Sequence, residues 1–159
     1  MSERTDFIRE KFQNTFNNPV EPVFFSAPGR TELGGNHTDH QNGCVLAAAV
    51  DLDMIAAAAK NGTNIVNIKS GNYKTLNINI NELRARRGEI GKTAALIRGV
   101  CFEISKRGYE IAGFDAYIDS IVPRGSGLSS SAAFEVLIGT IINDLFCKNS
   151  LSPTDIAII

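Results

Sequence analysis

Two stretches of the sequence bring together side chains that can do chemistry. In the first, residues 26–40, the letters SAPGRTELGGNHTDH place an arginine, two carboxylates, an amide and two histidines directly after an apolar run. The glycines allow tight backbone turns, and the mixture of hydrogen-bond donors and acceptors suits a polyhydroxylated ligand such as a sugar. Arg30 carries a permanent charge and can neutralise phosphate oxygens. The stretch therefore predicts a turn that binds a polar ligand.

Two other interpretations of this first stretch stay open from the residues alone. A well-hydrogen-bonded polar turn with a purely structural role is one of them. The other is a metal site with His37, Asp39 and His40 as ligands, although the sequence offers no helix or second ligand cluster to complete a metal shell.

The second stretch, residues 123–133, reads PRGSGLSSSAA and lies between a predicted strand and a predicted helix. Glycines let backbone N–H groups converge on a phosphate, and a helix N-terminus adds the positive end of its dipole. A serine hydroxyl can bond a phosphate oxygen or help to hold Mg²⁺. The stretch predicts a phosphate cradle, but not a Walker A loop, because no Gly-Lys-Ser/Thr closes it. A flexible Gly/Ser connector before an N-capped helix is the alternative.

The elements that must position these stretches follow from hydrophobic periodicity. Apolar residues recur at helical spacing, or helix-start signals occur, in residues 3–17, 93–106, 134–146 and from Ser152 onward. Continuous or alternating apolar runs predict strands from Val23 and over residues 44–49, 54–59, 64–68, 74–80 and 114–122. This order, with most strands before most helices, is compatible with an α+β arrangement of layers.

Composition and charge indicate an ordinary globular domain. The 159 residues are 43% hydrophobic and 21% charged, so one domain with one sizeable core is expected. A formal net charge of -1 supplies no global field for nucleic acid or an acidic membrane, and neither is expected as a partner. No segment approaches the roughly 20 apolar residues of a membrane span, and the N-terminus lacks the apolar region of a secretory signal. A soluble protein is expected.

The cysteines and the last residues add two expectations. Cys44, Cys101 and Cys147 are far apart and flanked mostly by apolar residues, which favours buried thiols in a reducing compartment over a disulfide framework. We therefore expect a cytoplasmic protein. Residues 156–159 would leave an apolar helix turn without its continuation, so a truncated chain is expected.

Together the two stretches resemble the signatures of the GHMP kinase superfamily, and the first is similar to the galactokinase signature. That signature runs Pro-Gly-Arg-x-Asn-Leu-Ile-Gly-Glu-His-Thr-Asp-Tyr and then x-x-Gly-x-Val-Leu, and PGRTELGGNHTDHQNGCVL reproduces most of it. The second family motif, Pro-x-Gly-x-Gly-Leu-Ser-Ser-Ser-Ala, is matched by PRGSGLSSSA. The resemblance covers the whole chain, although proteins of the family are longer.

The resemblance implies a role for each matched residue. Arg30 would lie beside the reacting sugar hydroxyl and the transferred phosphate and act in catalysis, while Asn36, His37 and Asp39 would bind the sugar. ATP and Mg²⁺ are the implied cofactors, and Ser130 would help to hold the metal. The residues implied to bind the nucleotide are Gly125, Ser126, Gly127, Leu128, Ser129, Ser130 and Ser131.

Several positions depart from the family pattern. Glu32 stands where the family has Asn, Gly34 where it has Ile, Asn36 where it has a sugar-contacting Glu, and His40 where it has Tyr. Galactose is the expected sugar, with galacturonate and N-acetylgalactosamine kept open. Residues 93–100, TAALIRGV, replace a stretch that is aromatic in galactokinases, so stacking of adenine is expected to be built differently.

The fold implied by the resemblance is the α+β N-terminal domain of GHMP kinases, related to the second domain of ribosomal protein S5. It has a mixed β-sheet with helices packed on one side, and we expect residues 1–159 to form this one domain. The implied reaction is transfer of the ATP γ-phosphoryl group to the anomeric hydroxyl of the sugar. The family's catalytic Asp would lie beyond Ile159, so this fragment alone is expected to be inactive.

Two further classes of function stay open beside the kinase. One is a non-catalytic protein that binds galactose and ATP and regulates transcription, since some galactokinase-like proteins do so. The other is an interaction or structural module of the same fold, for which the polar turn at residues 30–40 would be unnecessary.

Overall fold

A computed structural model describes residues 3–35 and 44–159. Apolar periodicity and turn residues divide this part of the chain into short alternating elements. The elements, in chain order, are α1 (Glu3–Phe16), β1 (Val23–Gly34), β2 (Leu46–Lys60), β3 (Ile65–Ser70), β4 (Leu76–Asn79), η2 (Arg87–Glu89), α2 (Thr93–Lys106), β5 (Phe114–Ser120), α3 (Ser130–Cys147) and α4 (Pro153–Ile158).

The strands form one mixed, five-stranded sheet in the order β1-β2-β5-β3-β4. Neighbouring strands are antiparallel except β3 and β5, which run parallel. The parallel pair follows from connectivity, because the chain passes through β4 and α2 before it returns as β5. The predicted α+β class and mixed sheet are confirmed.

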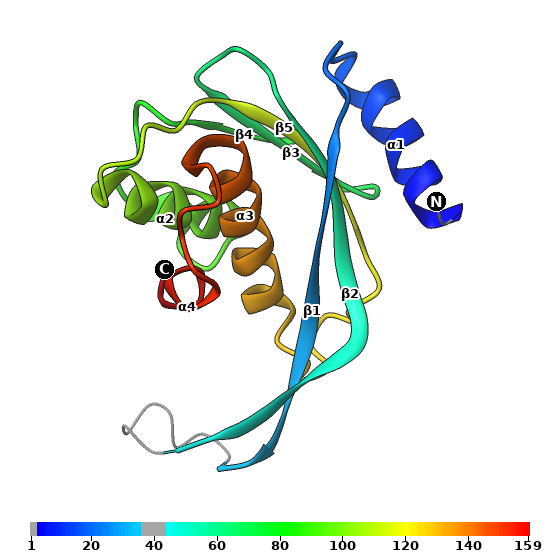
Figure 1. Ribbon diagram of the computed structural model, residues 1–159, viewed down its shortest axis with the longest axis vertical. Coiled ribbons are helices and arrows are strands. Elements are labelled where there is room, and N and C mark those ends of the chain that lie inside the picture. Colours follow the sequence, from blue (N-terminus) through cyan, green and yellow to red (C-terminus); the bar gives the residue numbers. More distant parts are fainter. Residues whose placement is uncertain (1–2, 36–43) are drawn as a thin grey trace.

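Helices cover both faces of this sheet (Figure 1). On β2, Ala56 and Ala58 belong to the main core with α2 and α3, whereas Ala57 and Ala59 pack with α1 in a second, smaller core. The prediction of helices on one side holds for α2, α3 and α4, and α1 departs from it. The physical reason is that small apolar residues occupy both faces of β2, so each face needs a cover.

The two strands predicted at residues 44–49 and 54–59 are one continuous strand, β2, and the prediction of a break around Asp51 was wrong. The side chain of Asp51 is exposed, so the strand continues past it without burying charge. The β1–β2 register is irregular at this point, because Pro28 pairs with Asp53 and Arg30 with Ala49, which leaves residues 50–52 of β2 as a bulge. A second irregularity falls between Glu32 and Gly34. Because β5 pairs with Met54–Lys60, the earlier part of β2 and its partner in β1 extend past the rest of the sheet (Figure 1).

Helix α3 is the central helix of the main core. It contributes Leu137, Ile138, Ile141 and Ile142, each fully buried. Its 18 residues are apolar enough to cross a membrane by length and composition, but half of them are buried inside the fold, as in the core helix of a globular protein.

A buried carboxylate ties several elements together without a cationic partner in the described chain. Asp115 on β5 is 5% exposed and accepts hydrogen bonds from the amide groups of Asn18 (2.9 Å), Asn61 (2.8 Å) and Asn67 (2.8 Å). Amide donors satisfy the charged group where water cannot reach it.

The cysteine prediction is partly confirmed. Cys101 and Cys147 are buried, whereas Cys44 is exposed, so the prediction of a buried thiol was wrong there. Cys44 lies just before β2, ahead of the part of that strand which pairs with β5. Burial raises the pKa of Cys101 to about 12, which suits an unreactive core thiol.

Candidate functional site

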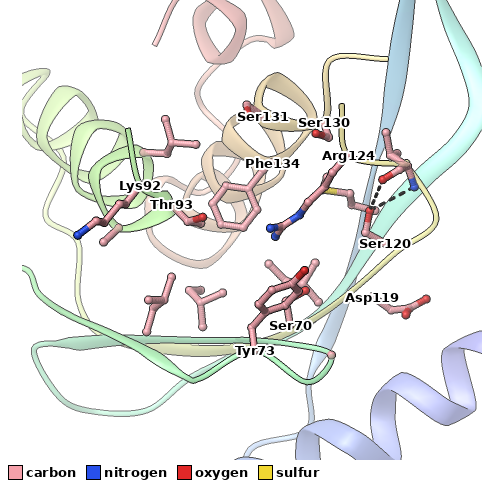
Figure 2. Close-up of a pocket in the computed structure, with 18 of the residues that line it drawn as sticks. Ser70, Tyr73, Lys92, Thr93, Asp119, Ser120, Arg124, Ser130, Ser131 and Phe134 are labelled. Atoms are coloured by element: carbon pink, nitrogen blue, oxygen red, sulfur yellow. Dashed lines mark hydrogen bonds between the residues drawn. The ribbon is translucent and has the colours of Figure 1, made fainter. Parts of the chain in front are cut away.

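A cavity of about 1010 Å³ lies between the sheet and the N-terminal ends of α2 and α3. Figure 2 shows its lining: Ser70 and Tyr73 project from the β3 side, and Lys92 and Thr93 from the start of α2. The wall at the other end is made by Asp119 and Ser120 of β5 together with Arg124, Gly125, Ser130, Ser131 and Phe134. Four elements, β3, α2, β5 and α3, therefore line one cavity with a polar rim.

The loop from β5 to α3 has a backbone that suits an anion. Gly125 and Gly127 have φ values of +71° and +76°, and Ser129, the residue before the helix, has φ 53°. Residues in this left-handed region, interspersed among ordinary ones, turn successive N–H groups toward a common centre. Glycine reaches such angles without strain, whereas Ser129 does so at a cost and marks a constrained position.

The start of α3 is left open for a ligand. No side chain of the described residues caps it, and its first turn holds no acidic residue. Helix α4 provides a contrast within the same chain, because Ser152 and Asp155 there form a reciprocal capping box. An uncapped helix start keeps its N–H groups and its positive dipole end available to a phosphate.

The two chemical stretches meet at this loop. The backbone N–H of Arg30 donates to the carbonyl oxygen of Leu128 (3.1 Å), and the Arg30 Nε donates to Ser129 Oγ (3.2 Å). The Ser129 hydroxyl thus contacts the arginine instead of capping its own helix. This contact places Arg30, near the start of the first stretch, against Leu128 and Ser129 of the second.

Close packing at Gly29 makes that contact possible. A Cβ atom at this position would lie 3.0 Å from the Leu128 carbonyl oxygen and 3.2 Å from methyl groups of Val122 and Val50. Such distances are tighter than ordinary van der Waals contact, so only glycine fits without a shift of the loop.

The predicted nucleotide residues have different positions. Gly125, Ser130 and Ser131 line the cavity. Ser126 donates its hydroxyl to the carbonyl of Pro123 (2.8 Å), and so its side chain serves the turn. Leu128, besides accepting from Arg30, packs its side chain against the main core.

The remaining predicted residues lie outside the cavity wall or outside the described chain. Gly127 shapes the loop, and Ser129 contacts Arg30; neither residue, nor Arg30 itself, lines the cavity. Asn36, His37 and Asp39 lie outside the described residues, as does His40. The metal-site interpretation of the first stretch depends on the same residues.

Sequence reasoning missed Tyr73, Arg124 and Phe134 as lining residues of the cavity. The Arg124 guanidinium lies 4.5 Å from the centre of the Tyr73 ring. The sequence held one signal for Tyr73, because it is an aromatic residue inside the polar turn SGNYK, where the local pattern does not require an apolar side chain. Thr93, Ala94 and Leu96, from the stretch already noted as departing from the aromatic pattern, also line the cavity.

An ion cluster fastens α1 to the strands beside the cavity. Arg4 donates from Nε to Asp119 (2.9 Å) and from a terminal nitrogen to Asp53 (2.5 Å), which also accepts from the Ser26 hydroxyl (2.7 Å). Burial acts to raise the pKa of Asp53, but the hydrogen bonds from Ser26 and Arg4 outweigh it and hold that pKa below its ordinary value.

A second ion pair holds the segment that leads into α2. Arg98, 3% exposed, forms two hydrogen bonds to the Glu89 carboxylate (2.8 and 2.9 Å) and a third to the carbonyl of Glu82. The hydrogen bond from Arg98 lowers the pKa of Glu89. This clamp fixes the residues just before Gly91 and Lys92, which line the cavity.

Within residues 3–35 and 44–159, no three His, Cys, Asp or Glu side chains gather as a group that could hold a metal ion. Single oxygen-bearing side chains do line the cavity, among them the Asp119 carboxylate and the hydroxyls of Ser130 and Ser131.

Comparison with known proteins gives two family matches. Residues 10–60 match the galactokinase galactose-binding signature, and residues 93–159 match the GHMP kinases N terminal domain. The galactokinase of Clostridium acetobutylicum is 37% identical over 148 residues, which cover 91% of this chain and 37% of that protein. The galactokinase of Bacillus subtilis is 33% identical over 139 residues, covering 85% of this chain and 35% of that protein.

Solved structures agree with the sequence matches. The crystal structure of Lactococcus lactis galactokinase complexed with galactose matches with a TM-score of 0.87 and 29% identity, over 96% of this chain and 40% of that one. Methanococcus jannaschii mevalonate kinase shares the fold with a TM-score of 0.66 and 18% identity, over 87% of this chain and 44% of that one. The chain thus spans well under half the length of these relatives.

Proposed function

We propose that the chain is the sugar- and nucleotide-binding part of an ATP-dependent galactokinase of the GHMP kinase family, because it matches the galactokinase galactose-binding signature and the GHMP kinases N terminal domain. The observation that carries the proposal is the contact of Arg30 with Leu128 and Ser129. It sets the arginine of the sugar signature at the edge of a loop shaped for phosphate. In this proposal residues 1–159 form one domain of a longer, cytoplasmic enzyme.

The loop residues fit a nucleotide triphosphate by their backbone geometry. Left-handed backbone at Gly125 and Gly127 and an uncapped α3 offer N–H donors at one end of a cavity large enough for a nucleotide. In the proposal Gly125, Ser130 and Ser131 contact the phosphates directly, and the Ser130 hydroxyl helps to hold Mg²⁺. Ser126, Gly127, Leu128 and Ser129 act by shaping the loop and docking it on β1.

Magnesium-bound ATP would supply the phosphoryl group and neutralise part of its charge. The chain itself contributes positioning and electrostatic stabilisation. Arg30, oriented by its hydrogen bond to Ser129, directs a permanent positive charge to the border between the phosphate loop and the sugar turn. Negative charge that develops on the transferred group is stabilised there. In the proposal Asn36, His37 and Asp39 hold sugar hydroxyls, with galactose as the preferred sugar.

Calorimetric titration tests this proposal. We expect Mg·ATP and galactose each to bind, and Arg30→Met to weaken Mg·ATP binding about tenfold, in keeping with loss of a charge-assisted contact. Arg107→Met, which changes an arginine at the end of α2, serves as the control with unchanged affinity. Galacturonate and N-acetylgalactosamine are titrated in parallel, and tighter binding of either one would replace galactose as the substrate.

Failure of the chain to bind Mg·ATP would contradict the kinase proposal and favour a structural module. Binding of both ligands by the complete protein without ADP formation would instead support the regulatory, non-catalytic class.

A further inference from the structure

The cavity holds an arginine–aromatic pair that the phosphate loop does not require. Tyr73 as a residue is 58% exposed, and the Arg124 guanidinium lies over its ring at 4.5 Å from the ring centre. Figure 2 shows both side chains inside the cavity, with Phe134 entering from α3. An aromatic ring left this exposed in a concave site offers a flat surface for stacking.

The backbone holds the ring in this position. The Tyr73 N–H donates to the Ser70 carbonyl (3.0 Å), the Lys69 ammonium donates to the Tyr73 carbonyl, and Gly71 supplies a φ of +46° for the turn. The turn is therefore ordered before any ligand arrives, so little conformational entropy is lost when a planar group stacks on the ring.

Arg124 directly precedes the proposed phosphate loop, which begins at Gly125. No carboxylate of the described residues forms an ion pair with its guanidinium, which lies over the Tyr73 ring. An exposed cation–π contact contributes only about 0.5–1 kcal/mol, less than a charge-assisted bond to phosphate. A polyphosphate on the loop would therefore attract this side chain away from the ring.

We propose that Tyr73 is the base-stacking residue of the nucleotide site and that Arg124 covers it until the nucleotide arrives. A purine whose phosphates lie on residues 125–131 takes the place of the guanidinium on the Tyr73 ring. The released Arg124 side chain then pairs with the phosphates. This inference rests on the proposed function and adds the residue that recognises the base, in a chain whose α2 start presents Thr93 and Leu96 to the cavity.

This exchange of the Arg124 guanidinium for a purine on the Tyr73 ring predicts that substitution of Arg124 has opposite effects on ligands with and without phosphate. Arg124→Ala is expected to weaken Mg·ATP binding about tenfold, because the phosphates lose a cation. The same variant is expected to tighten adenosine binding about two- to fivefold, because the base no longer displaces a cation–π contact. Tyr73→Ala is expected to weaken both ligands about tenfold, and Tyr73→Phe to keep both within about twofold of the unmodified chain.

Two titrations of this chain and its variants test the proposal. Mg·ATP binding is measured by calorimetry, and adenosine binding by ligand-observed NMR. Arg84→Ala, at an exposed arginine that borders a different cavity, is the matched control and should change neither affinity. The exchange is overturned if Arg124→Ala shifts both affinities in the same direction, or if Tyr73→Ala leaves Mg·ATP binding intact. An unmodified chain that fails to bind Mg·ATP overturns the proposed function and the exchange together.

Discussion

At the scale of single residues, Gly29 joins the two halves of the site. Its missing side chain lets β1 approach the Leu128 carbonyl so closely that the backbone N–H of the next residue, Arg30, can donate to it. The position of Arg30, which we propose to be catalytic, and the shape of the loop at residues 125–129 are thus coupled through one glycine. Sequence alone marked Gly29 only as a turn residue.

Gly29→Ala tests this coupling. We expect a loss of about 1–3 kcal/mol in the free energy of unfolding, since the added methyl group must displace Leu128, Val122 and Val50. We also expect weaker Mg·ATP binding, because the loop carries its N–H donors away from their common centre. Urea unfolding and calorimetry measure the two effects.

Gly34→Ala, on the same strand, is the control, because a Cβ there meets nothing within 4 Å. Equal effects of the two substitutions would show that the close approach at Gly29 has no special role.

At the scale of elements, α1 is placed by one apolar stripe and one charged side chain. Ile8 and Phe12 are fully buried against Ala57, Ala59 and Tyr117 on the face opposite α3. Arg4, at the start of the helix, reaches Asp53 on β2 and Asp119 on β5. Since Asp119 also lines the cavity, α1 supports the end of the central strand β5 that borders the cavity.

The Arg4–Asp53 contact predicts a specific dependence on pH. The pKa of Asp53 is lowered in the folded state, so its contribution to stability is complete above the ordinary aspartate pKa of about 3.9 and is lost as the pH falls through the lower folded value. Arg4→Met is expected to lower the free energy of unfolding by about 1–2 kcal/mol at pH 7. As the pH falls below about 4, the free energy of unfolding should then decrease less in the variant than in the unmodified chain. Urea titrations at several pH values measure both.

Lys11→Met provides the control on the same helix, since no carboxylate in the described residues pairs with Lys11, which lies over the Phe7 ring. If Arg4→Met and the unmodified chain lose stability in parallel below pH 4, the charged contact has no part in acid sensitivity.

At the scale of the whole molecule, the chain resembles one part of a longer enzyme. The structural match to Lactococcus lactis galactokinase covers 96% of this chain but only 40% of the galactokinase chain. The cavity, the phosphate loop and Arg30 lie within the described residues, and the proposal assigns the remaining machinery to the rest of such an enzyme. Binding and catalysis should therefore be separable.

We expect residues 1–159 to bind Mg·ATP but to release no ADP in a galactose-dependent manner. The reason is that positioning by Arg30 and the loop supplies only part of the stabilisation a phosphoryl transfer needs. A coupled ADP assay, with a complete galactokinase as the positive control, makes the measurement. Galactose-dependent turnover by this chain would refute the expectation and place all the required groups within it.

Much of the fold was predictable because it depends on local pattern. Helices α1 and α2 and strand β5 match the predicted segments closely, since their period and end signals are written in neighbouring residues. The turn before α3 was predictable in the same way, from glycine spacing and the position before a helix, whereas its role in binding phosphate stays a prediction. The break expected at Asp51 was wrong because β2 continues through a bulge there, and its pairing with β1 resumes on both sides.

What the sequence by itself determined is the α+β class, most of the order of elements and the two stretches proposed to carry the chemistry, because these depend on residues adjacent in the chain. Only the tertiary structure decided that α1 covers the second face, that three asparagines gather around Asp115 and that Arg124 lies on Tyr73. Each of these joins residues from different elements. Such contacts depend on how the elements pack, and no periodicity along the chain encodes which side chains meet.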